Sequence, residues 1–233
     1  MAERAEQLAQ DQQIVLYDYW RSSASYRVRI ALGLKGLSFR SISVDLVAGS
    51  HHDGAHLARN PQGLVPAIEI DGLMLTQSLA ILEYLEESRP GHPLLPADPA
   101  QRAHVRALSL AIACEIHPLS NLGVLKKVEG LAGAQARATW NRDNIRRGLE
   151  AVEAMLERSE FSGRFCLGER PGMADCTLIP QLYNATRWGV NFDDLGRICA
   201  VAQSCDDVPA FVAARPENFD PSREARELQG ETK

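Results

Sequence analysis

The chain has 233 residues, of which 45% are hydrophobic and 24% are charged, and its formal net charge is −5. This mildly acidic balance predicts no attraction to nucleic acid or to an anionic membrane, and five cysteines without a CxxC pair argue against a disulfide framework or a bound metal. No apolar run approaches the ~20 residues that span a bilayer, and residues 1–13 lack the apolar core of a signal peptide, so we expect a cytoplasmic protein.

The first elements are a strand and a helix. Residues 1–12 form a polar extension to which we assign no chemistry, and Ile14–Tyr17 is predicted to be a strand. Ser22 and Ser23 precede a helical apolar pattern that should end near residues 35–36. Serine hydroxyls cap helices, and a helix N-terminus can also hold an anion, so the two serines have a structural and a functional interpretation.

Residues 38–76 carry strand patterns around a polar segment. Residues 38–44 alternate and predict a second strand, and two apolar runs around Asp71-Gly72 predict a β-hairpin. Residues 47–60 contain three histidines (His51, His52 and His56) without an accompanying acidic or cysteine ligand set, which favours a solvated loop over a metal site. A helix should then open at residues 76–78 and run to about residue 88.

Beyond residue 90 the strand patterns disappear. Four prolines in residues 89–99 predict a linker, which we place at 91–98, between domains at 13–90 and 99–220. The second domain should be all-helical, with a kink at Pro118. Its helical patterns contain Val105, Leu108 and Ile112; Ile145, Leu149, Val152 and Leu156; residues 173–187; and residues 208–214.

Short motifs along residues 14–216 resemble the soluble glutathione transferases, and most closely their zeta class, the maleylacetoacetate isomerases. The motifs are Arg21–Leu32 (Arg-Ser-Ser-Ala-Ser-Tyr-Arg-Val-Arg-Ile-Ala-Leu), Asn60-Pro61…Val65-Pro66, Gln77-Ser78-Leu79-Ala80-Ile81, Leu94-Leu95-Pro96, Ile116-His117-Pro118-Leu119-Ser120-Asn121 and Met173-Ala174-Asp175. The resemblance implies an α/β thioredoxin-like N-terminal domain, an all-α C-terminal domain and a homodimer.

The resemblance also implies glutathione as the cofactor. The family has a cis Val-Pro bond, although sequence alone favours trans, and the backbone of Val65 would bind the cysteinyl part of glutathione as an added strand. Gln77 and Ser78 match the residues that hold the γ-glutamyl end, and Ser22 and Ser23 match hydroxyls beside the sulfur. We expect His117 to orient glutathione, and Asn121 is a second candidate.

The reaction that the resemblance implies is cis–trans isomerisation of a small maleyl dicarboxylate, a step of aromatic amino acid degradation. A thiolate adds to the double bond, the resulting single bond rotates, and elimination returns the trans isomer. We expect Ser22 to donate to the sulfur, with Ser23 in support. Arg21 and Arg187 would bind the substrate carboxylates, because a guanidinium stays charged and pairs bidentately. Arg27 ranks lower, as a structural residue that could pair with an acid.

Two positions depart from the zeta pattern. Ala24 replaces a cysteine, which excludes a mechanism that needs that protein thiol and leaves the thiol of glutathione as the nucleophile. Gly172 stands where the family often has Thr or Ser, a cap that is better by only a few tenths of a kcal/mol.

Four functions remain open at this point. The first is isomerisation of maleylacetoacetate, and the second is isomerisation of maleylpyruvate by the same mechanism. The third is general glutathione transfer to electrophiles, such as dehalogenation of small α-halo acids. A non-enzymatic binding protein ranks last, because it would be expected to lose the Ser-Ser and Gln-Ser pairs, which are present.

Overall fold

The computed structural model describes residues 14–158 and 160–222, so the predicted extension at residues 1–12 lies outside the described residues. The chain divides into two compact units. The first comprises the described residues up to His92 together with those from Ala210 onward, and the second is Pro93–Pro209. The domain boundaries expected from the sequence, 13–90 and 99–220 with a linker at 91–98, stay a proposal.

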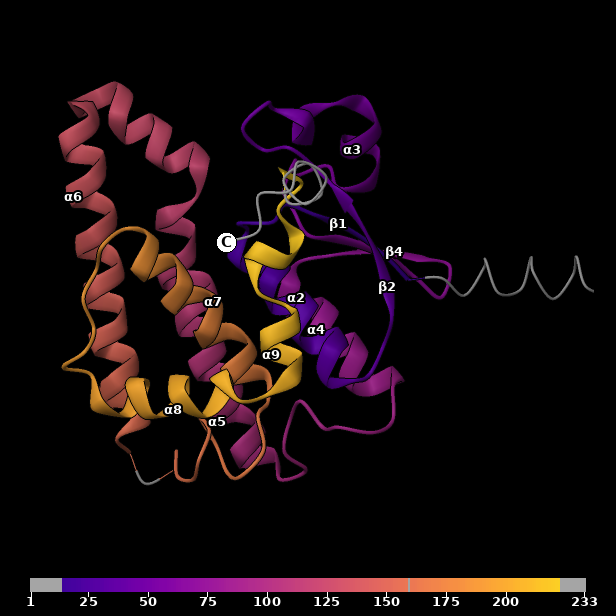
Figure 1. Cartoon of the computed structure of the whole chain (residues 1–233), viewed down its shortest axis with the longest axis vertical. Coiled ribbons are helices and arrows are strands. Elements are labelled where there is room, and N and C mark those ends of the chain that lie inside the picture. Colours follow the sequence, from indigo (N-terminus) through magenta and orange to yellow (C-terminus); the bar gives the residue numbers. More distant parts are fainter. Residues whose placement is uncertain (1–13, 159, 223–233) are drawn as a thin grey trace, which may run out of the picture. The chain divides into compact units, whose positions relative to one another are not determined.

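The first unit contains a four-stranded sheet in the order β2-β1-β3-β4 (Figure 1). β1 pairs in parallel with β2 and antiparallel with β3, and β3 pairs antiparallel with β4. Asp71 and Gly72 both have positive φ, at 53° and 74°, as the predicted two-residue hairpin turn requires. The strands are β1 (Ile14–Asp18), β2 (Phe39–Ser43), β3 (Ala67–Ile70) and β4 (Leu73–Thr76).

The helices of this unit are α2 (Ser23–Leu34), α3 (Gly54–Arg59) and α4 (Ser78–Ser88). α2 and α4 lie next to each other, apart from α3 (Figure 1). The solvated loop expected at residues 47–60 is wrong: a 3₁₀ turn (Ser50–His52) and α3 occupy the segment, and His56 is only 3% exposed. The sequence hid α3 because the helix is short and begins with glycine, a poor helix former.

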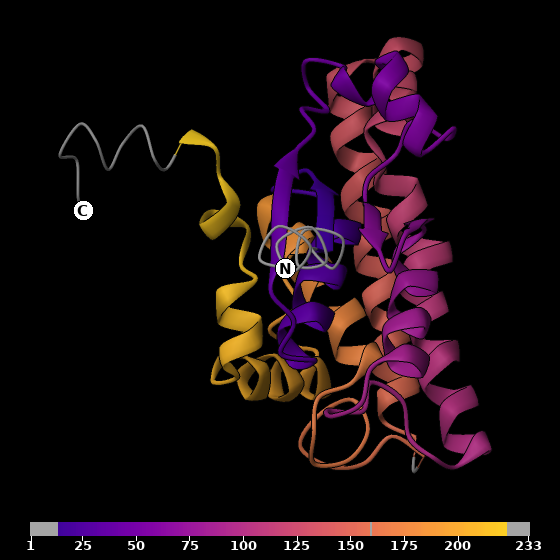
Figure 2. The ribbon, with the colours of Figure 1, turned by 90° about the vertical axis from the view of Figure 1, so that its right-hand side faces the viewer.

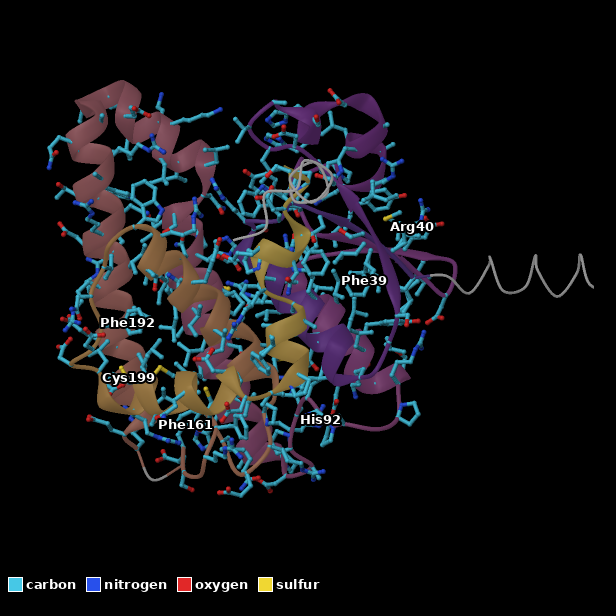
Figure 3. All side chains as sticks on the ribbon, viewed as in Figure 1. Phe39, Arg40, His92, Phe161, Phe192 and Cys199 are labelled. Atoms are coloured by element: carbon cyan, nitrogen blue, oxygen red, sulfur yellow. The ribbon has the colours of Figure 1, made fainter. Side chains whose placement is uncertain are left out.

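The C-terminal segment joins the first unit and runs alongside α2 in two views (Figures 1 and 2). It contains α9 (Pro209–Ala213) and a 3₁₀ turn (Pro216–Phe219). Arg29 Nε donates to the carbonyl of Ala214 at 3.1 Å, and its guanidinium lies 4.4 Å from the centre of the Phe219 ring. Phe219 stacks on Phe39 of β2, labelled in Figure 3, with ring centroids 6.1 Å apart.

Helices are the regular elements of the second unit, and its described residues contain no strand. The residues of the two predicted apolar stripes are all buried, with exposures of 0–3%. The predicted break at Pro118 is confirmed, since the helical axis turns by 43° between residues 99–120 and 122–156. The elements are α5 (Pro99–Leu110), a π-helical turn (Ala111–Ile116), a 3₁₀ turn (His117–Ser120), α6 (Leu122–Leu156), α7 (Met173–Arg187) and α8 (Gly196–Asp206). α6 is kinked at Gly133, whose backbone (φ 85°, ψ 172°) is not helical.

The sequence did not predict α8, which crosses the ends of α6 and α7 (Figure 1). Its N-terminus is capped from another helix: the Glu153 carboxylate of α6 accepts the backbone N–H groups of Arg197 and Ile198 at 2.7 and 2.8 Å. Such a long-range cap leaves no local signal in the sequence.

Among the described residues no single helix is long and apolar enough to cross a membrane. One bent pair of helices, residues 99–120 with 122–156, reaches the length and apolar composition of a membrane span, and this likeness rests on length and composition only.

Candidate functional site

The register of the sheet brings three separate segments to one end of the first unit. β1 ends at Asp18, and β3 begins at Ala67, which lies opposite Tyr17. β4 ends at Thr76, which lies opposite Ala67 on the other side. The turn after β1, the Val65-Pro66 pair before β3 and the residues after β4 therefore meet at the same end of the sheet. This end contains six of the predicted site residues: Arg21, Ser22, Ser23, Val65, Gln77 and Ser78.

Ser22 is the N-cap of α2. Its backbone is extended (φ −71°, ψ 118°), and its Oγ accepts the backbone N–H of Ser25 at 3.2 Å. A hydroxyl has two lone pairs and one proton, so this cap leaves the Ser22 proton available to a further acceptor. The first turn of α2 contains no acidic residue, so no carboxylate competes for the positive end of the helix. Ser23, the first residue of α2, is 6% exposed.

Val65 lies two residues before β3, and its peptide bond to Pro66 is cis, as the family resemblance implied. The residue is 9% exposed, and the structure gives its backbone N–H and C=O no hydrogen bond to other described residues. Unpaired backbone groups beside a strand can pair with an extended peptide, which is how one chain adds a strand to another's sheet.

Gln77 and Ser78 form the start of α4. Gln77 has φ 67° and ψ 109°, a conformation that L-residues rarely adopt and that is found mostly where function demands it. The Ser78 side chain is buried, and its Oγ accepts from Arg27 Nη1 at 3.2 Å. Arg27, which the sequence analysis ranked low as a structural residue, thus places a buried cation directly behind Ser78.

The two candidate arginines are both exposed. Arg21 stacks on the ring of its neighbour Trp20 at 4.0 Å and makes no ion pair with a carboxylate of the described chain. Arg187, in the second unit, is the last residue of α7, and its guanidinium lies 6.0 Å from the centre of the Tyr183 ring. The Arg21 guanidinium stacks on a ring face, which keeps its N–H edge available to a carboxylate.

His117 and Asn121 also lie in the second unit, at the break that Pro118 produces. His117 opens the 3₁₀ turn, and Asn121 is the N-cap of α6. The Asn121 side chain makes no capping hydrogen bond, so the helix does not use the amide. Both residues are half-buried.

Four of the protein's five thiols are poor candidates for a nucleophile. Burial raises the pKa of the thiols of Cys166, Cys176, Cys199 and Cys205, which disfavours the reactive thiolate. With Ala24 in place of the family cysteine, the predicted end of the sheet contains no cysteine. Chemistry that needs a thiolate there must use a thiol that comes from a ligand.

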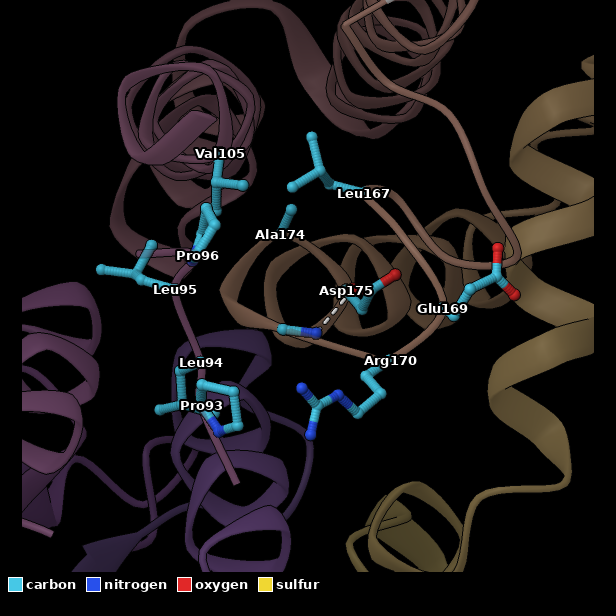
Figure 4. A pocket seen from close by; sticks show the side chains of 11 residues that line it. Pro93, Leu94, Leu95, Pro96, Val105, Leu167, Glu169, Arg170, Ala174 and Asp175 are labelled. Carbon is cyan, nitrogen blue, oxygen red and sulfur yellow. Dashed lines mark hydrogen bonds between the residues drawn. The ribbon is translucent and has the colours of Figure 1, made fainter. Parts of the chain in front are cut away.

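A small pocket of about 160 Å³ in the second unit lies apart from the predicted residues (Figure 4). The side chains of Leu95, Val105 and Ala174 form part of its apolar wall, and Arg170 lies at its edge. Asp175 also lines it, but its Oδ2 accepts the backbone N–H of Gly172 at 2.8 Å, so this carboxylate stabilises the start of α7. None of the predicted site residues lines this pocket.

Comparison with known families gives two matches. Residues 12–87 match the glutathione S-transferase N-terminal domain, and residues 129–206 match the glutathione S-transferase C-terminal domain. The chain is 54% identical over 209 residues to the maleylacetoacetate isomerase of Rhizobium meliloti (strain 1021), covering 89% of this chain and 98% of that one.

Two solved structures are similar in fold and sequence. One is a holo structure of maleyl pyruvate isomerase, a bacterial zeta-class glutathione S-transferase, with a TM-score of 0.86 and 40% identity over 89% of this chain and 99% of that one. The other is a maleylacetoacetate isomerase from Methylobacterium extorquens AM1 with bound malonate and glutathione, with a TM-score of 0.83 and 38% identity over 87% of this chain and 96% of that one.

Proposed function

Because the chain belongs to the glutathione S-transferase family, we propose that it is a glutathione-dependent cis–trans isomerase that converts maleylacetoacetate to fumarylacetoacetate. The observation that carries this proposal is the Ser22 hydroxyl, which caps α2 and keeps its own proton free, in a chain 54% identical to a maleylacetoacetate isomerase. The same geometry is suited to holding a thiolate at the N-terminus of a helix.

The residues at this end of the sheet fit glutathione. The unpaired backbone of Val65 can receive the cysteinyl amide groups as an added strand. The γ-glutamyl end carries a carboxylate, and the N-terminus of α4, the Ser78 hydroxyl and the buried Arg27 cation all favour an anion. The strained backbone of Gln77 supports a ligand-binding role for its side chain.

Glutathione, when bound, supplies the thiol whose thiolate adds to the double bond and leaves after the bond has rotated. A free thiol has a pKa near ~8.5, so the chain must favour its ionised form. We assign this to Ser22, whose hydroxyl donates to the sulfur, and to the N-terminus of α2, whose partial positive charge stabilises the anion. Ser23 supports Ser22 from the first turn.

The cationic side chains bind the substrate carboxylates. We assign this role to Arg21 and Arg187, which are both exposed. Arg21 also makes no ion pair with a carboxylate of the described residues. We assign His117 and Asn121 to the orientation of glutathione, on the family resemblance and on the uncommitted amide of Asn121. We further propose a cytoplasmic homodimer that binds neither nucleic acid nor a membrane.

Maleylpyruvate is the second candidate substrate, because a maleyl pyruvate isomerase is among the similar structures. The two substrates differ only at the end away from the maleyl group, so thiolate addition would be the same. General glutathione transfer, the competing function, would use the same thiolate. The new sulfur–carbon bond would then remain in the product instead of breaking again.

The decisive experiment supplies the purified protein with maleylacetoacetate and, separately, maleylpyruvate, each with glutathione, with S-methylglutathione or with neither. We expect rapid isomerisation with glutathione only, and the higher kcat/KM with maleylacetoacetate. S-methylglutathione is the matched control, because it retains the peptide but has no free thiol. A higher kcat/KM with maleylpyruvate would establish the second candidate, and isomerisation of neither substrate with glutathione would overturn the proposed function.

A further inference from the structure

The carbonyl oxygen of Leu64 accepts two side-chain hydrogen bonds immediately before Val65. His56 Nε2 lies 2.9 Å from this oxygen, and Asn60 Nδ2 lies 2.8 Å from it. Both side chains belong to residues that are almost fully buried, at 3% and 2% exposure. A carbonyl can only accept, so His56 must carry its proton on Nε2. Two buried donors therefore converge on one peptide group next to the predicted binding strand.

Hydrogen bonds of side-chain amides connect this loop to Gln77, at the start of α4. The Oδ1 atom of Asn60 accepts the backbone N–H of Gln62 at 3.1 Å, and Gln62 Oε1 accepts from Gln77 Nε2 at 2.7 Å. Gln77 is the residue with the strained backbone at the start of α4. The His56–Asn60 pair thus fixes the peptide before Val65, and the Gln62 side chain links the same loop to Gln77.

We propose that His56 is a positioning residue for glutathione, acting with Asn60 through the Leu64 carbonyl, and that Gln62 extends this action to Gln77. The inference rests on the proposed function, in which the Val65 backbone and Gln77 receive the peptide. His56 touches neither the sulfur nor the substrate. It holds the Leu64–Val65 peptide in its binding orientation before the ligand arrives, so less conformational freedom is lost on binding.

A histidine that only filled space would behave differently. An apolar side chain of similar size could occupy a buried site without needing a polar partner, and it would leave the Leu64 carbonyl with one donor fewer. The Nδ1 atom of His56 is buried and has no hydrogen-bond partner among the described residues, so the ring's polar contact is the bond from Nε2. Burying a polar ring costs free energy unless the ring is hydrogen-bonded, so the bond from Nε2 is the contact that offsets this cost.

The test compares His56→Leu, which removes the donor, with His56→Gln, whose amide nitrogen can replace Nε2. His52→Leu is the matched control, because His52 is exposed on the neighbouring 3₁₀ turn and the side-chain hydrogen bonds to the Leu64 carbonyl come from His56 and Asn60. Isothermal titration gives the Kd of glutathione, and steady-state kinetics give kcat at saturating glutathione. Hydrogen exchange of the peptide covering residues 57–70 reports whether glutathione protects the Val65 amide.

We expect His56→Leu to raise the Kd of glutathione about five- to tenfold, the change that corresponds to one hydrogen bond of ordinary strength. His56→Gln should restore the wild-type Kd to within about threefold, and kcat at saturation should stay within about twofold for both, because the reacting atoms are untouched. A folded His56→Leu protein that binds glutathione as tightly as the wild type would overturn the positioning role.

Gln62→Ala keeps the inference testable should His56→Leu fail to fold, because Gln62 is exposed and its loss should not unfold the chain. Its expected effect is a rise of about threefold in the Kd of glutathione, and an unchanged Kd would then overturn the proposal. Failure of the proposed function has a separate signature: the wild-type protein itself would bind no glutathione and would show no protection of residues 57–70.

Discussion

Arg29 Nη1 lies 2.7 Å from Oδ2 of Asp18, and both residues are only 1% exposed. The same guanidinium donates to the carbonyls of Trp20 and Ala214, at 3.0 and 3.1 Å. One buried cation therefore joins the end of β1, the turn that leads to Ser22, and the C-terminal segment. Breaking a buried pair by removing one partner leaves an uncompensated charge in a low-dielectric interior.

We predict that Arg29→Met lowers the free energy of unfolding by about 3–5 kcal/mol, because the Asp18 carboxylate loses its partner inside the protein. Urea denaturation followed by circular dichroism measures this change. Arg164→Met is the matched control: its Nη2 lies 3.9 Å from the Asp207 carboxylate at an exposed position, so its loss should cost less than about 1 kcal/mol. Equal effects of the two substitutions would contradict the prediction.

Ser22→Ala should lower kcat/KM about 10²- to 10³-fold, the usual effect of removing one donor to a reacting anion. It should also cost about 1 kcal/mol of stability, because Ser22 caps α2. Steady-state kinetics and the ultraviolet absorbance of the bound thiolate as a function of pH measure the two functional consequences, and the thiolate should form at higher pH in the variant.

Ser23→Ala provides the comparison for the same reaction. Ser23 supports Ser22 in our assignment and does not cap the helix, so its loss should reduce kcat/KM less than the loss of Ser22. A larger effect at Ser23 would exchange the two roles, and near-normal activity of Ser22→Ala would remove Ser22 from the site.

Arg187→Gln should raise the KM for the dicarboxylate at least about tenfold and leave the KM for glutathione nearly unchanged, because a charged, bidentate contact to the substrate is lost. Arg187→Lys should recover only part of this, since an ammonium cannot pair bidentately. Initial rates over a grid of both substrate concentrations separate the two KM values. A KM for the dicarboxylate equal to that of the wild type would exclude Arg187 from substrate binding.

The parts of the fold that could be predicted from the sequence rest on local patterns. The Asp71-Gly72 turn, the Ser22 cap and the buried stripe through Ile145 and Leu149 are each encoded within a few neighbouring residues. The proposed glutathione-site residues required the family resemblance in addition, because a serine at a helix start is equally well explained as a cap. Their convergence follows from strand register, which the sequence does not display.

The missed elements depend on contacts between distant residues. α8 is capped by Glu153 from another helix, and the buried His56 hydrogen bonds to the Leu64 carbonyl, eight residues ahead. A histidine in a polar segment is usually solvated, so only the structure distinguishes this one from His51 and His52. The strained φ of Gln77 is likewise invisible in the sequence, because glutamine seldom adopts it.

At Gly172 the sequence and the structure predict opposite effects of a substitution on stability. From the sequence alone the glycine is a slightly inferior cap, so Ser should stabilise the start of α7 by a few tenths of a kcal/mol. In the structure, however, a Cβ at this position would lie 2.7 Å from the Leu94 carbonyl oxygen, which already accepts the backbone N–H of Met173 at 2.7 Å. The close approach of two backbone segments leaves no room for a side chain.

We therefore predict that Gly172→Ser lowers the free energy of unfolding by about 1–3 kcal/mol, the usual cost of overpacking, despite the better cap. Urea denaturation measures the change. Gly130→Ser is the matched control, because Gly130 lies on the exposed face of α6 and a Cβ there would meet nothing within 4 Å. That substitution should be neutral or stabilising, since serine is a better helix former than glycine. A Gly172→Ser protein as stable as the wild type would show that the Leu94 segment moves away at no cost.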